Sequence, residues 1–220
     1  MVRQGLLIFD LDGTLFRTET VTIPAVQHAF RARGLPIPPL EKIRSFFGRP
    51  TREFNDWIRT LTPGNPDDEL VADVSRGELE LISETGELFP AVGEVLSTLR
   101  ERVQEMAICS NGTGDYVPRV VEVHGLRRYF DLVVFRGDSK SDKPRMVRTI
   151  LEKLDGRPGA VIGDRRDDIE AAHENGLAAI AALYGYGPPD ELKDADAFAE
   201  SPAHLLDLIP PFLGGGRRQI

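Results

Sequence analysis

Short runs of consecutive apolar residues limit the choice of fold. Four of them occupy residues 6–9, 106–109, 132–135 and 160–162, and a weaker fifth occupies residues 178–181. A strand is apolar at every position when both faces of its sheet are covered, as in a parallel sheet between layers of helices. Between the runs, apolar residues recur every three or four positions, as helices require. This alternation predicts an α/β fold with a parallel, doubly wound sheet.

One long segment interrupts the alternation soon after the first run. Residues 16–85 contain no clear strand pattern, and their apolar residues recur at helical spacing in four groups separated by glycine and proline turn signals. We therefore expect four short helices inserted between the first strand and the rest of the sheet. The predicted organisation is a core of residues 1–15 and 86–220 with a small, all-helical domain of residues 16–85.

Composition narrows the classes of partner. The 220 residues carry a formal net charge of −8, which does not attract nucleic acid or anionic lipid. The single cysteine, Cys109, excludes an intramolecular disulfide and fits a reducing compartment. The first apolar run is too short for a signal peptide or a membrane span. We expect a cytoplasmic protein without nucleic-acid or membrane partners, either a monomer or a small homo-oligomer.

Polar residues follow three of the predicted strands. In an open α/β sheet, ligands bind beyond the carboxyl ends of the strands, so these residues should share one edge. Lys143 opens the helix before the fourth strand and should join them. The segments concerned are Asp10-Leu11-Asp12-Gly13-Thr14, Ser110-Asn111-Gly112, and Gly163-Asp164 with Asp167 and Asp168 beyond it.

The chemistry of this edge suits phosphoryl transfer. Crowded carboxylates repel one another unless a cation joins them, and carboxylate oxygens suit Mg²⁺. A lysine, a hydroxyl and backbone N–H groups can stabilise the charge that spreads over a transferring phosphoryl group. Taken alone, each segment also has a simpler interpretation. Asp-Gly is a turn signal, and acidic residues such as Asp167 favour the start of a helix.

The four segments together resemble a known family. The sequence 10–15 is similar to motif one of the haloacid dehalogenase (HAD) superfamily, and the other three motifs follow in order along nearly the whole chain. The helical insert resembles the cap of the phosphoglycolate phosphatase-like branch. The resemblance implies a Rossmann-like core with a helical cap. The remaining motifs are Ser110-Asn111, Lys143-Pro144, and Gly163-Asp164 with Asp168.

The resemblance also implies a role for each residue. Asp10 is expected to attack phosphorus and form an aspartyl-phosphate, while Asp12 moves protons as a general acid and base. Mg²⁺ is expected to be held by Asp10, by the backbone carbonyl of Asp12 and by Asp164, with Asp168 in support. The phosphoryl group of a small phosphorylated metabolite is expected to be bound by Ser110, Asn111 and Lys143.

Three arginines depart from the pattern of the family. Arg17 lies in Phe16-Arg17-Thr18, where relatives often carry an acidic residue followed by Ser or Thr. Arg165 and Arg166 replace a serine and a small or apolar residue. Arg17 is either a solvated residue at the base of the cap or a contact for an anionic substrate. Arg165 and Arg166 either clamp a substrate anion or pair with Asp167 or the cap.

Other functions remain open at this level. A phosphosugar mutase uses the same aspartyl-phosphate but returns the phosphoryl group to a sugar. A phospho-accepting receiver also gathers Asp residues, a hydroxyl and a lysine around Mg²⁺, although receivers lack a helical insert. A catalytically silent binding protein is the third alternative. By resemblance, the first substrate to consider for a Mg²⁺-dependent phosphatase is phosphoglycolate.

Overall fold

The fold is described from a computed structural model of the chain, which covers residues 4–62, 67–136, 141–154 and 158–213. Six strands form one sheet in the order β3-β2-β1-β4-β5-β6, and every neighbouring pair is parallel. The strands are β1 (Gln4–Phe9), β2 (Val103–Ser110), β3 (Leu132–Phe135), β4 (Gly159–Gly163), β5 (Ala178–Ala182) and β6 (Ala197–Ala199). The predicted parallel, doubly wound α/β sheet is confirmed.

The central strand shows why its sequence is apolar throughout. Leu7 and Phe9 of β1 belong to the apolar cluster on one face of the sheet, and Leu6 and Ile8 belong to the cluster on the other. Alternate residues of a strand point to opposite faces, so a strand buried on both sides has no position for a polar residue. The run therefore ends where the strand leaves the core, at Asp10.

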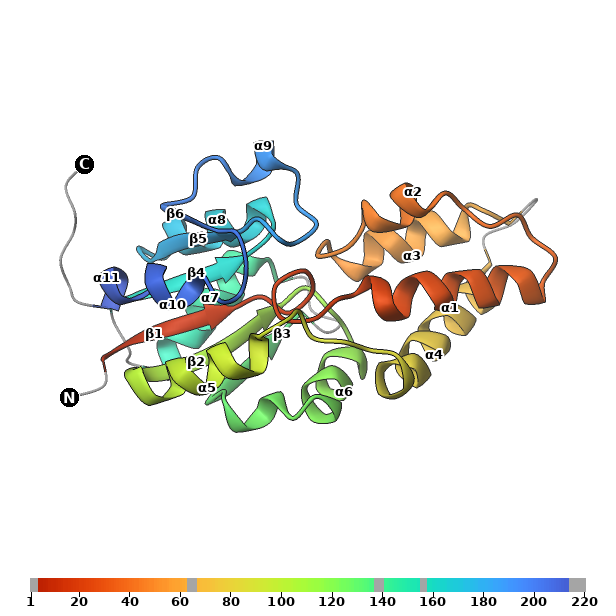
Figure 1. Cartoon of the computed structure of the whole chain (residues 1–220). Helices are drawn as coiled ribbons and strands as arrows, with labels where there is room; N and C mark the ends of the chain where they lie inside the picture. The colour runs from red at the N-terminus through yellow and green to blue at the C-terminus, as the bar shows by residue number, and fades with distance from the viewer. Residues whose placement is uncertain (1–3, 63–66, 137–140, 155–157, 214–220) are drawn as a thin grey trace.

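Helices cover both faces of the sheet (Figure 1). One face packs against α5 (Val92–Arg102), α6 (Tyr116–Val123), the 3-10 turn η1 (Leu126–Arg128) and α10 (Leu205–Leu208). The other packs against α7 (Lys143–Lys153), α8 (Arg166–Glu174) and the short α9 (Pro189–Leu192). The last described helix is α11 (Pro210–Leu213), which contacts β1 and β4. This arrangement puts β1 at the point where the sheet is built outward in both directions, which is where such folds bind ligands.

Four helices between β1 and α5 form a separate lobe beyond the carboxyl ends of the strands (Figure 1). They are α1 (Glu19–Ala32), α2 (Leu40–Arg44), α3 (Thr51–Arg59) and α4 (Asp68–Glu84). The lobe has its own apolar cluster, in which Phe30, Ile43 and Ile58 are buried. We call these four helices the cap.

Two segments connect the cap to the sheet, and they run side by side. Arg17 N donates to the Glu87 carbonyl at 2.9 Å, and Phe89 N donates to the Leu15 carbonyl at 3.0 Å. Both hydrogen bonds lie close to the predicted limits of the helical insert, at residues 15–16 and 85–86. The limits of two domains remain a prediction, since these contacts describe a connection and not independent folding units.

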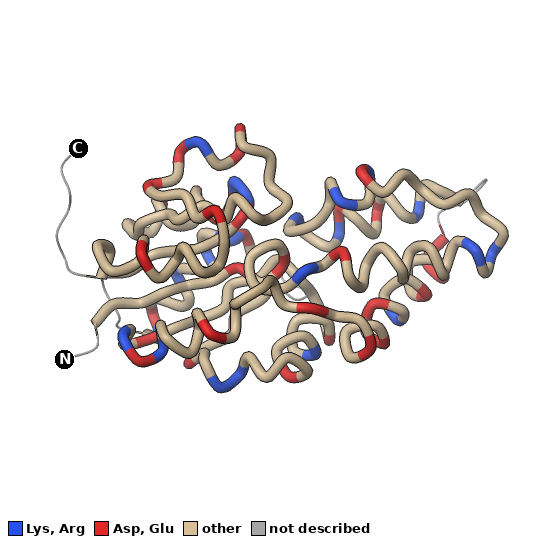
Figure 2. The backbone as a smooth tube through the Cα atoms, viewed as in Figure 1, with Lys and Arg blue, Asp and Glu red and all other residues tan. Residues whose placement is uncertain are grey.

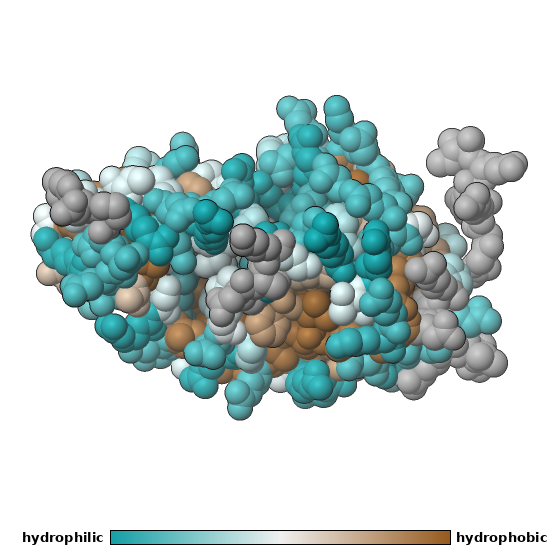
Figure 3. Space-filling model, turned by 180° about the vertical axis from the view of Figure 1, so that it is seen from behind, coloured by the Kyte–Doolittle hydropathy of each residue, from teal (hydrophilic) through white to brown (hydrophobic). Residues whose placement is uncertain are grey.

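The surface is polar and mixed in charge. Figure 2 shows acidic and basic residues interspersed over the sheet and the cap, and the face in Figure 3 is mostly hydrophilic around one apolar area. Among the residues that the structure describes, no helix combines the length and hydropathy needed to cross a bilayer.

Candidate active site

Four charged side chains meet beneath the cap, at the carboxyl edge of the sheet. The Lys143 ammonium lies 3.0 Å from Asp10 Oδ1 and 2.6 Å from Asp168 Oδ1. Asp10 follows β1, Lys143 is the first residue of α7, Asp164 follows β4, and Asp168 lies in the first turn of α8. No more than 1% of any of the four residues is exposed. The structure therefore brings together these four residues, which the sequence predicts to share one edge of the sheet.

Burial controls the charge states in this cluster. It raises the pKa of Asp10 to about 7, although the Lys143 ammonium opposes the rise and the Asp164 carboxylate adds to it. Burial also raises the pKa of Asp164 and Asp168, and repulsion from a neighbouring carboxylate contributes to both shifts. Burial alone would lower the pKa of Lys143, but the Asp10 carboxylate and its neighbours hold it well above its usual value. Three carboxylates thus face a single ammonium.

The three carboxylates fit a divalent cation. Ligand oxygens of Asp10, Asp164 and Asp168, which we call the acidic cluster, lie within 4.8 Å of one another. Among the described residues, Asp10 Oδ2 and Asp164 Oδ1 are buried without a hydrogen-bond partner. Buried carboxylate oxygens without a partner are costly, and hard oxygen ligands of this kind suit Mg²⁺. The acidic cluster includes Asp168, to which the sequence assigned only a supporting role. That the Asp12 carbonyl is a metal ligand remains a prediction.

Asp164 is fixed in place by backbone groups. Its Oδ2 accepts hydrogen bonds from Tyr186 N at 2.7 Å and from Gly187 N at 3.3 Å. Gly13 packs directly against this carboxylate with a φ of +85°, so a Cβ there would collide with Asp164 and the backbone would be strained. The Asp-x-Asp-Gly segment therefore needs its glycine to bring Asp164 next to Asp10.

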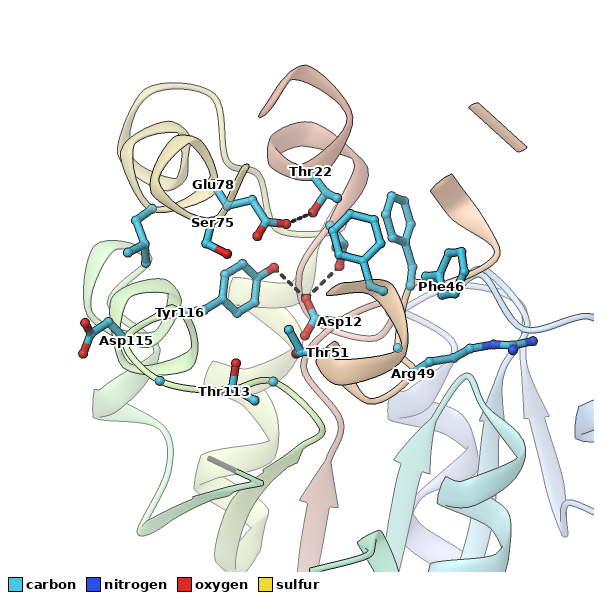
Figure 4. Close-up of a pocket in the computed structure, with 17 residues that line it drawn as sticks. Asp12, Thr22, Phe46, Arg49, Thr51, Ser75, Glu78, Thr113, Asp115 and Tyr116 are labelled. Carbon is cyan, nitrogen blue, oxygen red and sulfur yellow. Dashed lines mark hydrogen bonds between the residues drawn. The ribbon is translucent and has the colours of Figure 1, made fainter. Parts of the chain in front are cut away.

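Asp12 lies apart from the acidic cluster and faces a cavity. Its Oδ1 accepts hydrogen bonds from Thr18 Oγ1 and from Tyr116 Oη, both at 2.7 Å (Figure 4). Burial raises the pKa of Asp12, and the two hydrogen bonds act against that rise. Asp12 borders a cavity of about 220 Å³, which also reaches α1, α4 and α6. The two aspartates of the motif thus occupy different environments, one charged and closed and one open to the cavity.

Two predicted phosphate-binding residues are also buried: Ser110, which ends β2, and Asn111, which follows it. Ser110 Oγ accepts a hydrogen bond from Gly112 N at 3.0 Å. The Asn111 amide donates to the Gly48 carbonyl of the cap at 3.0 Å and to Asp167 Oδ2 at 2.6 Å. Asn111 therefore joins the cap to α8 in this structure. Asp167 lies at the start of α8, as expected from the sequence, and is also a partner of Asn111.

The three unusual arginines are all engaged with protein groups. Arg17 pairs with Glu19 at 3.2 Å and with Glu87 at 2.5 Å, at the base of the cap. Arg165 pairs with Glu191 of α9 at 3.1 Å, and its aliphatic stem packs against the cap residue Gly48. Arg166 is exposed, and its backbone N–H approaches Glu191 Oε2 at 3.5 Å. The contacts favour a structural role for Arg17 and Arg165, although the ion-pair partner of Arg165 is Glu191 and not Asp167 or a cap residue.

Several residues of the site escaped the sequence analysis. Thr18 and Tyr116, which donate to Asp12, come from the start of α1 and of α6, and the sequence assigned neither of them a role. Glu78 of α4 borders the cavity and accepts a hydrogen bond from Thr22 at 2.5 Å. A signal for Glu78 does exist, because it lies four residues from Val74 and from Ile82 and so interrupts the buried face of α4.

Comparison with known proteins agrees with this geometry. Residues 7–182 match the haloacid dehalogenase-like hydrolase family. The phosphoglycolate phosphatase of Vibrio vulnificus is 32% identical, over 93% of this chain and 95% of its own length. Two solved structures share the fold. They are a predicted phosphoglycolate phosphatase from Haemophilus somnus (TM-score 0.78, 22% identity, 94% and 99% coverage) and a candidate β-phosphoglucomutase from Thermotoga maritima (TM-score 0.76, 23% identity, 93% and 97% coverage).

The family match covers most of the chain, and the motifs that carry the resemblance are the segments that build the site. The chain therefore belongs to the haloacid dehalogenase-like hydrolases and resembles their phosphoglycolate phosphatase-like branch.

Proposed function

We propose that this protein is a Mg²⁺-dependent phosphatase that hydrolyses a small phosphomonoester through an aspartyl-phosphate on Asp10. As a member of this family, the chain is a phosphoric monoester hydrolase. One observation carries the finer proposal. Asp10 of the acidic cluster contacts Lys143 through one oxygen, and its other oxygen has no hydrogen bond to the described residues. Asp12, in contrast, borders the cavity.

The acidic cluster supports the metal assignment. Asp10, Asp164 and the Asp12 carbonyl would hold Mg²⁺, with Asp168 positioned to support them. A bound Mg²⁺ offsets the negative charge of the carboxylates and of the phosphoryl oxygens. Lys143 offsets further charge next to Asp10 Oδ1, and its contact with Asp168 fixes its ammonium in place.

In the first step, an Asp10 carboxylate oxygen attacks phosphorus and the bond from phosphorus to the leaving oxygen breaks. Asp12 gives its proton to that oxygen, so the leaving group departs as a neutral alcohol. Burial raises the pKa of Asp12, which favours the protonated form that this step needs. Ser110 and Asn111 would contact the phosphoryl oxygens. To do so, the Asn111 amide must give up its hydrogen bond to the Gly48 carbonyl or to Asp167.

In the second step, a water molecule attacks the phosphorus of the aspartyl-phosphate. Asp12, now ionised, accepts the proton of the water, the bond between phosphorus and Asp10 breaks, and inorganic phosphate and the Asp10 carboxylate result. The hydrogen bonds from Thr18 and Tyr116 hold the Asp12 carboxylate in one orientation for both proton transfers.

The relatives guide the choice of substrate only in part. Curated relatives are named phosphoglycolate phosphatases, so phosphoglycolate is a substrate to test. A phosphosugar mutase would share the first step and return the phosphoryl group to a sugar, and the shared fold of the candidate mutase does not distinguish the two. Cytoplasmic location, the absence of nucleic-acid and membrane partners, and the oligomeric state remain predictions from composition.

Phosphate release from a panel of small phosphomonoesters tests the proposal. With Mg²⁺ we expect release of inorganic phosphate from part of the panel, and none when EDTA is in excess. Full activity in EDTA would contradict the metal assignment. Conversion of a sugar phosphate into its isomer without free phosphate would identify a mutase, and a stable phospho-Asp10 without turnover would identify a phospho-accepting protein.

A further inference from the structure

The cavity above Asp12 is where the leaving group must lie, if the proposed function is correct, because Asp12 protonates the departing oxygen. The cavity is small, at about 220 Å³, whereas sites for drug-sized ligands begin at roughly 300 Å³. Its walls come from the cap helices and from the start of α6 (Figure 4). The chemistry of these walls therefore decides which leaving groups are accepted.

Neutral hydrogen-bonding groups and aromatic rings make up most of the wall. Hydroxyl side chains are numerous, and each can donate to or accept from an alcohol. Two of the rings belong to the loop between α2 and α3, and the third lies on α3. The hydroxyl residues are Thr18, Thr22, Thr51, Ser75, Thr113 and Tyr116, and the rings are Phe46, Phe47 and Phe54.

Glu78 adds a carboxylate to this wall. It is half-buried on α4, and Figure 4 shows its side chain reaching toward Thr22 and Tyr116. The structure gives it one hydrogen bond, from Thr22 Oγ1 to Oε1 at 2.5 Å. A carboxylate oxygen accepts hydrogen bonds only, so its second oxygen is available to a donor on the substrate. When ionised, Glu78 makes the cavity repel a negatively charged leaving group, because like charges repel.

Cations that could bind a substrate carboxylate are directed elsewhere. Arg49 is the one basic residue among the described residues that line the cavity, and Figure 4 shows its guanidinium pointing away from Asp12 and Glu78. It lies 3.8 Å from Glu53 on the exposed side of α3. Arg17 and Arg165 are paired with glutamates, as described above. The usual device for holding a carboxylate, a free guanidinium, is therefore missing from the described wall.

We infer that Glu78 is a specificity-determining residue, which selects phosphomonoesters of a small, neutral, hydroxyl-bearing leaving group and rejects those that carry a carboxylate. The Glu78 carboxylate accepts a hydrogen bond from a hydroxyl of the leaving group. It repels the carboxylate of phosphoglycolate. On this account the protein differs in substrate from the relatives named above.

Matched substrates test the inference. 2-Hydroxyethyl phosphate and phosphoglycolate differ only in a hydroxymethyl group against a carboxylate, and so do glycerol 3-phosphate and 3-phosphoglycerate. With Mg²⁺, at a pH of about 8, we expect kcat/KM to be at least roughly tenfold higher for the hydroxyl member of each pair. A preference for either carboxylate would overturn the inference and leave the phosphatase intact. If phosphoethanolamine, whose leaving group carries an ammonium, were hydrolysed faster than 2-hydroxyethyl phosphate, the inferred preference for a neutral leaving group would be overturned.

Variants assign the preference to Glu78. In Glu78→Gln the preference for the hydroxyl member should fall by roughly fivefold or more, because the repulsion is removed while the shape is kept. Glu80→Gln, on the exposed side of the same helix, should keep the wild-type ratio. An unchanged ratio in Glu78→Gln would overturn the role of Glu78. If no substrate, including p-nitrophenyl phosphate, releases phosphate, the proposed function fails and the inference fails with it.

Discussion

The floor of the site and the cavity above it are built from different parts of the chain and by different physics. The floor consists of the four buried charged residues at the carboxyl edge of the sheet: Asp10 and Asp164 follow strands, and Lys143 and Asp168 lie in the first turns of helices. The cavity is lined mostly by side chains from the cap and from the start of α6, which carry hydroxyls, rings and, on α4, the carboxylate of Glu78. The comparison teaches that the floor determines the reaction and the cavity determines the substrate, so substitutions in the two regions should have different kinetic effects.

Asp10→Asn should have the largest effect. Asparagine has nearly the same shape but lacks the nucleophilic carboxylate, so kcat should fall by roughly 10⁴-fold or more with every substrate. The circular dichroism spectrum should not change, since Asn fits the same space beside Lys143. Steady-state phosphate release measures the loss. Activity near that of the wild type would remove Asp10 from the mechanism.

Lys143→Gln should come next, because the floor loses its only ammonium. We expect kcat to fall by roughly 10²- to 10³-fold, since one preorganised positive group near the phosphoryl oxygens is lost. The variant should also unfold at lower urea concentration without Mg²⁺, since Asp10 and Asp168 become unpaired. Lys153→Gln, on the exposed end of the same helix, is the control and should behave as the wild type. Similar losses in both variants would contradict the assigned role.

Tyr116→Phe probes the boundary between floor and cavity. It removes one of the two hydrogen bonds to Asp12 Oδ1 and should slow the first step about tenfold for an alkyl phosphate. Hydrolysis of p-nitrophenyl phosphate should be slowed less, because its leaving group departs without a proton. Single-turnover kinetics separate the two substrates. Equal slowing of both would show that Tyr116 does not act through Asp12, and Tyr129→Phe provides the remote control.

Glu78→Gln should have the smallest effect on turnover among these variants, and its effect on stability should depend on pH. Burial raises the pKa of Glu78 to about 7 in the folded protein, and the hydrogen bond from Thr22 opposes that rise. The unfolded state releases this proton near the ordinary value of 4.5, so wild-type stability falls as the pH rises from about 4.5 to about 7.

The variant removes this cost. Urea unfolding should find Glu78→Gln more stable than the wild type by roughly 1–3 kcal/mol at a pH of about 8, and nearly equal at a pH of about 5. Glu80→Gln should match the wild type at both values. A variant that is less stable at the higher pH would mean that the Glu78 carboxylate is paired by a group other than Thr22.

The two regions also differ in how far the sequence alone predicts them. The five apolar runs are strands β1 to β5, and the motif residues at their ends lie at one edge, because strand periodicity and the parallel sheet determine both. Strand β6 was not predicted, since Ala197–Ala199 is three residues long and has no apolar run around it. The four helices of the cap were predicted from their spacing.

The contacts between cap and sheet could not be predicted in the same way. Three side chains meet near Asp12 only because α1, α4 and α6 pack together; they are Thr18, Glu78 and Tyr116. The sequence pattern of one helix does not predict which other helices it packs against. Asn111 shows the same limit, since its amide contacts Gly48, which is 63 residues away in the sequence. Motifs at strand ends therefore predict the reaction better than they predict the substrate.

The covalent role of Asp10 is the central claim, and rapid-quench labelling tests it most directly. Wild-type protein is mixed with Mg²⁺ and a ³²P-labelled phosphomonoester that it hydrolyses, quenched in acid, and digested to locate the label. We predict a transient label on the peptide that contains Asp10, which appears before free phosphate reaches its steady rate and is absent in Asp10→Asn. Phosphate released at full rate with no label on the protein at any time would contradict the account.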